Sequence, residues 1–364
     1  MRVNHQKMPA ITEVRNTPIF FIIGRPRSGT TLLRHLFDAH PNVNIPSECN
    51  YILALSRKYK HTEKFDRKTL EKFLEDLKQT KSYDTLSMDD ELLKKNVFSV
   101  PENITYPELC KIVHASYASI HDKKEMLLIG DKNPAYSSEN FTKVFSLFPD
   151  AKFIHLIRDY RDQATSLLKA RFKSLSPAFI ALTWKGSLKT INRCKQKSPE
   201  NFFTLRYEDF VREPEKHFGE LCSFLQIPND IGVFSFNVKK EKYIDHQPGI
   251  NYDMHHKSLF QPIDEKRVGI WKDFLKGNEL AVAEKIAGNV ALQYGYQKSI
   301  DKPTLRATLS AFRWEFIYIL LKGLRSFIYI LTIKRRNYFV AGLKKNKMTN
   351  FVYYKIIFRS KTKE

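Results

Sequence analysis

Residues 19–31, IFFIIGRPRSGTT, constrain the fold more than any other stretch of the chain. Ile19–Ile23 is an unbroken apolar run, short and rich in β-branched residues, which predicts a buried parallel strand. The run stops at Gly24, and LLRHLFDAH then places Leu32, Leu33 and Leu36 on one helical face. A strand, a glycine-bounded turn and a helix N-terminus direct backbone N–H groups and a helix dipole at one point, which suits an anion.

The turn itself has the spacing of a nucleotide-triphosphate P-loop, Gly24-x-x-x-x-Gly29. A P-loop continues with a lysine that reaches the β- and γ-phosphates, and here Thr30 takes that position. Arg25 and Arg27 lie inside the loop instead. The loop is therefore suited to a phosphate, while an ordinary NTPase is disfavoured.

Other apolar runs alternate with helical patterns along the chain. Strands are predicted within residues 126–133, 151–157 and 201–207, and helices over 137–148, 160–171, 177–196, 213–227, 265–275 and 278–294, with residues 228–262 as a loop. This alternation predicts an α/β fold with a parallel sheet flanked by helices. Ligands bind beyond the carboxyl ends of such strands, and Lys132 and Arg158, like the loop, fall at predicted strand ends.

The stretch RPRSGTTLLRHLFDAHPNV resembles the phosphosulfate-binding loop and first helix of sulfotransferases that use 3′-phosphoadenosine 5′-phosphosulfate (PAPS). The resemblance is closest to the branch with the tyrosylprotein sulfotransferases and their bacterial relatives, and it covers about residues 18–297. It implies a P-loop-like sulfotransferase fold and transfer of a sulfuryl group from PAPS to a hydroxyl. It also implies that the loop binds the phosphosulfate, through Arg25, Arg27, Ser28, Gly29, Thr30 and Thr31.

Sulfuryl transfer needs a base for the acceptor hydroxyl and cations for the oxygens that gain charge. Glu48 lies twenty-one residues after Arg27, a separation that matches the catalytic glutamate of the tyrosylprotein branch. Lys132, in Asp-Lys-Asn-Pro, matches the family lysine that neutralises the bridging oxygen. The resemblance thus implies Glu48, Lys132 and Arg27 as catalytic residues. Without that spacing, Glu48 reads as an ordinary surface carboxylate.

Arg158 and Ser166, eight residues apart, match the family's clamp on the 3′-phosphate. Arginine supplies a bidentate fork and serine a hydroxyl donor. A 3′-phosphate clamp distinguishes PAPS from an ATP-type ligand. The alternative is that Arg158 pairs with Asp159 or Asp162 at the surface.

Other cofactor-side positions match the family less closely. Tyr207 aligns with a cofactor-side tyrosine, and Ser258 corresponds loosely to a family serine. The tyrosylprotein branch has a further arginine where this chain has Ala170, so Lys169 or Arg171 is left to substitute for it. The acceptor-recognition segments of that branch do not carry over, so peptide tyrosine is not implied as the acceptor.

Composition and charge narrow the class of protein. A chain of 364 residues with 42% hydrophobic residues can bury a large core. The four cysteines form no C-x-x-C pair, and His255-His256 has no ligand at metal spacing nearby, so no metal site is expected. The scattered cysteines suit a reducing compartment, and residues 1–17 lack the apolar region of a signal peptide, so we expect a cytoplasmic protein.

The C-terminal region carries much of the +22 net charge. Residues 302–364 hold fifteen Lys and Arg against two Glu, a net +13, which leaves +9 for residues 1–301. Within residues 315–336 a helical projection gives one polar stripe on an apolar rod, formed by Glu315, Lys322, Arg325, Tyr329, Thr332 and Arg336. This pattern predicts a helix lying on an anionic membrane, peripheral to its inner face. Packing on the catalytic domain or a second chain, and a spanning helix, are the alternatives; nucleic acid is disfavoured because no reading motif accompanies the charge.

The domain prediction follows from these features. Residues 1–300 are expected to form the catalytic domain, with 57–126 as a helical excursion that serves as an acceptor lid or as a plain cover, and residues 301–364 a basic amphipathic extension. The acceptor class spans steroids, lipids, phenols and sugars, and a membrane-bound tail favours an apolar sterol, steroid or lipid. A P-loop-type kinase and a non-catalytic membrane-associated binding protein remain as other classes.

Overall fold

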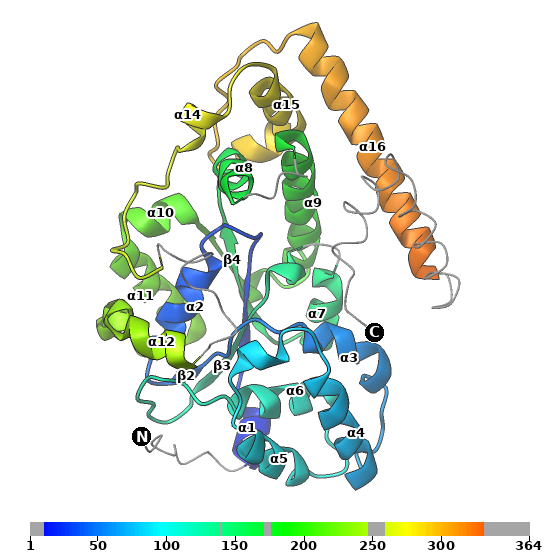
Figure 1. The fold of residues 1–364 in the computed structure, drawn as a ribbon, viewed down its shortest axis with the longest axis vertical. Helices are drawn as coiled ribbons and strands as arrows, with labels where there is room; N and C mark the ends of the chain where they lie inside the picture. Colours follow the sequence, from blue (N-terminus) through cyan, green and yellow to red (C-terminus); the bar gives the residue numbers. More distant parts are fainter. Residues whose placement is uncertain (1–10, 138–139, 171–175, 247–258, 331–364) are drawn as a thin grey trace. The chain divides into compact units, whose positions relative to one another are not determined.

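The computed structural model describes residues 11–137, 140–170, 176–246 and 259–330 (Figure 1). The chain divides into two compact units. The first unit contains residues 1–158 and 190–265, and the second contains residues 159–189 and 266–364.

The first unit is built on a five-stranded sheet in which every pair of neighbouring strands is parallel. The strands are β1 (Ile19–Ile23), β2 (Val43–Asn44), β3 (Leu128–Lys132), β4 (Lys152–Ile157) and β5 (Phe202–Arg206), in the order β2-β3-β1-β4-β5. Every residue of β1 is buried, as expected for a central strand covered on both faces. The predicted parallel α/β sheet is confirmed. Its centre, where β1 lies between β3 and β4, is a topological switch point.

Helices surround this sheet (Figure 1). They are α1 (Ile11–Asn16), α2 (Thr30–Ala39), α3 (Tyr51–Tyr59), α4 (Arg67–Lys78), α5 (Asp90–Phe98), α6 (Tyr106–Ala115), α7 (Phe141–Leu147), α10 (Tyr207–Arg212), α11 (Pro214–Leu225), α12 (Lys240–His246) and the C-terminal end of α9 (Pro177–Lys195). Aromatic rings form the centre of the packing: Phe153 stacks on Phe21 at 5.5 Å and on Phe202 at 5.0 Å between ring centroids.

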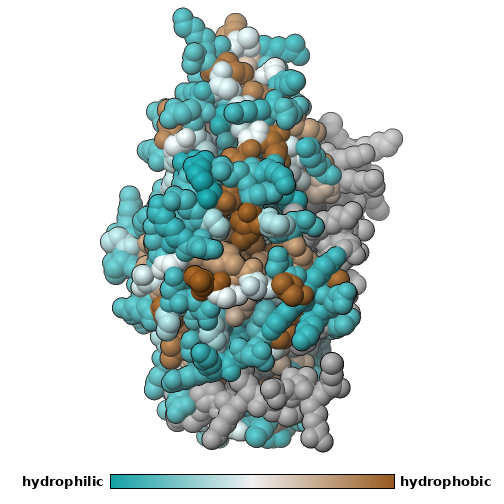
Figure 2. Space-filling view, turned by 90° about the vertical axis from the view of Figure 1, so that its left-hand side faces the viewer, coloured by the Kyte–Doolittle hydropathy of each residue, from teal (hydrophilic) through white to brown (hydrophobic). Residues whose placement is uncertain are grey.

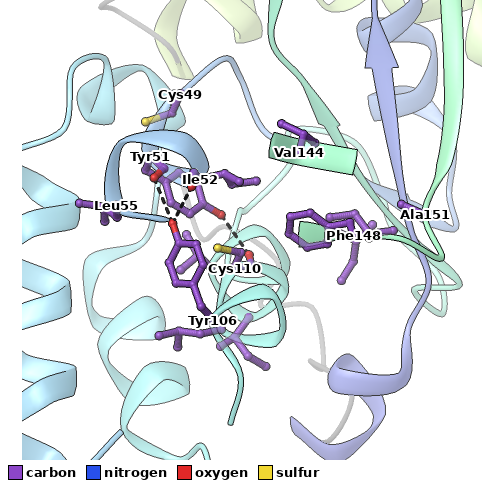
Figure 3. Packing of buried hydrophobic residues seen from close by; sticks show 14 of the residues in the cluster. Cys49, Tyr51, Ile52, Leu55, Tyr106, Cys110, Val144, Phe148 and Ala151 are labelled. Atoms are coloured by element: carbon purple, nitrogen blue, oxygen red, sulfur yellow. Dashed lines mark hydrogen bonds between the residues drawn. The ribbon is translucent and has the colours of Figure 1, made fainter. Parts of the chain in front are cut away.

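The predicted helical excursion, residues 57–126, forms α4, α5 and α6 and a 3₁₀ turn, Tyr83–Leu86. Its buried side chains belong to the same hydrophobic cluster as β1. Figure 3 shows how α3 and α6 are joined: Tyr106 Oη donates to the Ile52 carbonyl at 2.8 Å, and Tyr51 Oη donates to the Cys110 carbonyl at 3.0 Å. The excursion is therefore held firmly against the segment that carries Glu48.

Two predicted segments differ from the structure. The loop expected over 228–262 contains a 3₁₀ helix, Ile231–Lys239, followed by α12, and Val233, Phe236 and Tyr243 are its buried side chains. A 3₁₀ helix has three residues per turn and so does not show the 3.6-residue period of an α-helix. The helix expected over 265–275 is reduced to α14 (Trp271–Phe274). Gly269 has φ 75°, a left-handed conformation that interrupts a helix.

The second unit consists of α8 (Tyr160–Lys169), the first part of α9, α14, α15 (Gly277–Gln293) and α16 (Leu305–Ile330). A smaller core holds it together, formed by Ala164, Leu167, Ile180, Trp271, Leu275 and Leu280. Arg161 forms a buried ion pair with Glu284 at 2.8 Å, and the Asp162 carboxylate accepts from the Trp271 backbone N–H at 3.0 Å.

Over the described ranges, no helix combines the length and the apolar character that crossing a membrane requires. The face of the molecule in Figure 2 is mostly hydrophilic, with small hydrophobic areas between polar side chains. Such a mixture is ordinary for a surface in contact with water.

Candidate active site

The loop after β1 turns sharply into α2. The Ser28 N–H donates to the Arg25 carbonyl at 3.2 Å, and Arg27 and Gly29 have left-handed φ values of 68° and 90°. Glycine is required at position 29, because a Cβ there would lie 2.6 Å from the ring of Tyr207. The loop backbone is thus folded tightly at the carboxyl end of β1, immediately before a helix N-terminus.

Arg158 and Tyr207, two predicted cofactor residues far apart in sequence, meet at this loop. Arg158 follows β4 and donates from Nη1 to the Arg27 carbonyl at 2.9 Å. Its guanidinium lies 4.5 Å from the centroid of the Tyr207 ring, the ring that also faces Gly29. Arg158 is thus a buried cation held between the loop and an aromatic face, where it supplies fixed positive charge beside the loop.

Lys132 contacts two other predicted active-site residues, Thr31 and Glu48. Lys132 pairs with Ile22 in the sheet register, so it leaves β3 at the same edge as the loop. Its Nζ donates to Thr31 Oγ1 at 3.2 Å and forms an ion pair with Glu48 Oε1. The structure therefore brings together the proposed base and the proposed leaving-group lysine.

The electrostatics of this pair are asymmetric. The side chain of Lys132 is 3% exposed, whereas that of Glu48 is 42% exposed. Burial lowers the pKa of Lys132 from its ordinary value, and the neighbouring Glu48 carboxylate opposes that shift. A buried cation thus faces a carboxylate that water and a solute can reach.

Not every predicted site residue is placed beside the loop. Ser166 lies in α8, which belongs to the second unit, and Ser258, His255, His256 and Arg171 lie outside the described residues. The Nζ of Lys169 lies 5.6 Å from the centroid of the Phe274 ring. The Arg158–Ser166 clamp therefore stays a prediction.

Arg34 is a positioning residue that sequence reasoning missed. It lies on α2, is buried, and donates from Nη2 to the Ile45 carbonyl at 2.9 Å and from Nε to the Pro46 carbonyl at 3.3 Å. These bonds fix the segment that leads to Glu48 against the helix that starts at the loop. A single arginine in an amphipathic helix gives no sign in the sequence that it is buried.

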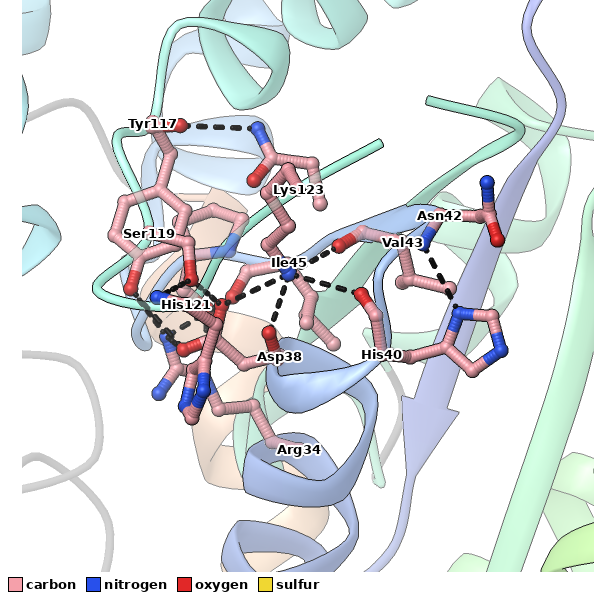
Figure 4. A network of polar contacts seen from close by, with 12 residues as sticks. Arg34, Asp38, His40, Asn42, Val43, Ile45, Tyr117, Ser119, His121 and Lys123 are labelled. Carbon is pink, nitrogen blue, oxygen red and sulfur yellow. Dashed lines mark hydrogen bonds and ion pairs between the residues drawn. The ribbon is translucent and has the colours of Figure 1, made fainter. Parts of the chain in front are cut away.

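Lys123 is a second buried cation that the sequence did not reveal (Figure 4). Its Nζ donates to the carbonyls of Val43 at 2.7 Å and His40 at 3.1 Å, and also to that of Asp38. Burial lowers the pKa of Lys123 to about 8, and the Asp38 carboxylate opposes that shift. This cation ties the end of α2 to β2, although its sequence context, HDKKE, looks like an exposed polar turn.

Comparison with known proteins identifies the family. The model of the sulfotransferase family matches residues 18–230, more than half of the chain. The chain belongs to the sulfotransferase family. Curated relatives include a protein-tyrosine sulfotransferase of Drosophila melanogaster, 24% identical over 79% of this chain and 54% of the relative, and protein-tyrosine sulfotransferase 1 of Homo sapiens, 28% identical over 70% of this chain and 62% of the relative.

The chain spans only between about half and two thirds of the length of these first relatives. Among solved structures, the sulfotransferase domain from the curacin biosynthetic pathway aligns with a TM-score of 0.52 at 22% identity, covering 77% of this chain and 98% of that one. The sulfotransferase domain of the Synechococcus PCC 7002 olefin synthase gives a TM-score of 0.52 at 21% identity, covering 81% and 98%. These structures share the fold of this chain.

Proposed function

We propose that this chain transfers a sulfuryl group from PAPS to a hydroxyl acceptor. The observation that carries the proposal is the contact of Lys132 with both Thr31 and Glu48 at the edge of the sheet where the loop turns. Family membership and the relatives named as protein-tyrosine sulfotransferases support the reaction class.

In this proposal the loop and Arg158 hold the anionic donor. The backbone N–H groups from Gly29 to Thr31 and the helix dipole of α2 would face the 5′-phosphosulfate. Arg158, fixed by the Arg27 carbonyl and the Tyr207 ring, adds a fixed positive charge. By family resemblance Arg158 acts with Ser166 on the 3′-phosphate, and Ser258 is a further cofactor contact.

Glu48 and Lys132 then divide the transfer between them. The Glu48 carboxylate takes the proton of the acceptor hydroxyl as the acceptor oxygen forms its bond to sulfur. The bond between sulfur and the bridging phosphate oxygen breaks, and its electron pair stays on the 5′-phosphate of the departing adenosine 3′,5′-bisphosphate (PAP). The Lys132 ammonium stabilises that charge, as a positioned cation does in phosphoryl transfer.

The acceptor side is proposed to lie around the 3₁₀ turn Tyr83–Leu86. Thr85 Oγ1 donates to the Glu48 carbonyl at 3.2 Å, and Cys49 Sγ lies 3.5 Å from Thr80 Oγ1. This part of the helical excursion therefore borders the proposed base. We propose a steroid, sterol, lipid or phenol hydroxyl as the acceptor, with sugars and tyrosine peptides as the classes to test against it.

The test is incubation of the full chain with sulfur-labelled PAPS and pooled steroid, lipid, phenol, sugar and tyrosine-peptide acceptors. We expect label in one class, and a loss of about 10²- to 10⁴-fold in kcat for Glu48→Gln. Glu102→Gln, which removes an exposed carboxylate paired with Lys64, is the matched control and should keep full activity.

Calorimetry with nucleotides separates the other classes. Binding of PAP without transfer to any acceptor would identify a non-catalytic binding protein that kept the fold. Tight binding of ATP in preference to PAP would favour the kinase. Full activity of Glu48→Gln would remove the base assignment.

A further inference from the structure

One face of α16 packs within the second unit. Ala307 and Ala311 are buried, Glu315 pairs with Lys185 of α9 at 3.2 Å, and the Tyr318 ring lies 6.2 Å from that of Phe179. The polar stripe predicted to begin at Glu315 therefore starts on the packed side of the helix. This packing leaves the opposite side of α16 to be explained.

The opposite side is apolar and exposed. Its large side chains are between 55% and 75% accessible, and they are Leu305, Leu309, Phe312, Phe316, Ile319 and Leu320. Their spacing places all six on one side of the helix, and we call them the outer stripe. A continuous apolar stripe with two phenylalanines is more than the isolated exposed apolar residues that a water-facing helix normally shows.

Positive charge borders the outer stripe. Arg306 and Arg313 are exposed and lie at one edge of it by helical spacing, and the exposed Lys322 lies toward the other side. The whole of residues 302–364 has a net charge of +13. An apolar strip with cations at its margin is complementary to the acyl boundary and anionic headgroups of a bilayer, whereas a partner protein would need a matching acidic groove.

We propose that the outer stripe of α16 lies in the interface of an anionic lipid membrane, parallel to its surface. The apolar side chains enter the boundary between headgroups and acyl chains, and Arg306 and Arg313 contact phosphates. Lateral binding also agrees with the finding that no helix in the described residues, α16 included, is long and apolar enough to cross a membrane. The inference does not rest on the proposed reaction, because it uses residues outside the candidate active site.

The experiment is co-sedimentation of the full chain with phosphatidylcholine vesicles, with and without about one third phosphatidylserine. We expect binding to the anionic vesicles only. Phe312→Ser with Phe316→Ser should weaken the partition coefficient by roughly tenfold for each residue, and Arg306→Gln and Arg313→Gln by about fivefold each.

Ile231→Ser with Val238→Ser is the matched control, since both residues are exposed apolar side chains of the first unit. This variant should bind vesicles like the unchanged chain. Circular dichroism and a thermal unfolding transition like that of the unchanged chain verify that every variant is folded. The proposal would be overturned by an equal loss of vesicle binding in the control or by equal binding to neutral and anionic vesicles. It would also be overturned if light scattering showed a dimer that Phe312→Ser converts to a monomer, because a second copy of the chain would then cover the outer stripe.

Discussion

Glu48 and Lys132 neutralise each other before any donor arrives. Because Lys132 is buried, its charge is compensated chiefly by Glu48, and in the proposed reaction a phosphosulfate would have to compete with that carboxylate for the ammonium. Donor binding would therefore release the base at the moment it is needed. In the proposed reaction the ion pair thus ensures that Glu48 becomes available as a base only after the donor has bound Lys132.

This competition gives a prediction about binding. Glu48→Gln keeps a hydrogen-bonding group but removes the opposing charge, so we expect it to bind PAP about fivefold more tightly than the unchanged chain while losing turnover. Calorimetry at constant salt measures it, with Glu102→Gln as the control. Weaker binding by Glu48→Gln would contradict this prediction. It would mean that the ion pair is needed to keep the binding site in its structure, and that this effect outweighs the gain from removing the competing carboxylate.

His155 gives a prediction about pH. It lies buried in β4, and burial, followed by the charge of Lys195, lowers its pKa to about 3. Nδ1 has no hydrogen-bond partner within the part of the chain that the structure describes. Below pH 6.5 the unfolded chain binds a proton that the folded chain does not take up until about pH 3, so stability falls by about 5 kcal/mol as the pH is lowered through this window.

Chemical denaturation at several pH values measures that slope. His155→Leu should flatten it, whereas His61→Gln, at an exposed position, should leave it unchanged. A slope that is the same in His155→Leu and the unchanged chain would show that the buried imidazole is already protonated in the fold.

At the scale of elements, α2 is fixed at both ends by groups that a helical wheel does not reveal. Its start is set by Gly29, and its end by Lys123, which donates to the carbonyls of His40 and Val43 (Figure 4). Lys123→Met keeps the stem but leaves these carbonyls and the buried Asp38 without that cation. We expect a loss of about 3 kcal/mol in the free energy of unfolding, against less than 0.5 for the exposed Lys124→Met.

A transition midpoint from thermal or urea unfolding measures the difference. PAP affinity should also fall in Lys123→Met, because α2 begins at the loop that is proposed to bind the phosphosulfate. An unchanged stability for Lys123→Met would mean that Arg34 alone compensates Asp38.

The same helices show where sequence was informative. Strands β1, β3, β4 and β5 lie inside the predicted runs, because a parallel strand with helices on both faces is largely apolar in sequence. Buried polar groups left no such trace: Arg34 and Lys123 look like surface residues until their carbonyl partners are known. The helical turns of 231–246 were missed because their first part is a 3₁₀ helix, which lacks the 3.6-residue period that marks an α-helix in a sequence.

At the scale of the whole molecule, the candidate active site and the proposed membrane-binding surface belong to different units of the chain. The loop, Glu48, Lys132 and Arg158 belong to the first unit, and the outer stripe of α16 belongs to the second. The glycine-bounded motif located the loop in the sequence, whereas the charge of residues 302–364 pointed to an amphipathic stretch at 315–336 and not to the outer stripe, which begins at Leu305. Only the structure shows which side of α16 is exposed, because the helical period of the sequence is the same whether an apolar face packs on the protein or faces outward.

This separation predicts that the two proposals can be tested in one kinetic comparison. With Phe312→Ser and Phe316→Ser, kcat/KM should stay constant for a water-soluble phenol and fall by about tenfold for a sterol supplied in anionic vesicles, because the enzyme no longer concentrates at the surface that holds the acceptor. Glu48→Gln should lose activity on both. An equal loss on both acceptors in the double serine variant would mean that α16 stabilises the catalytic fold. That result would contradict a role for the outer stripe in membrane binding alone.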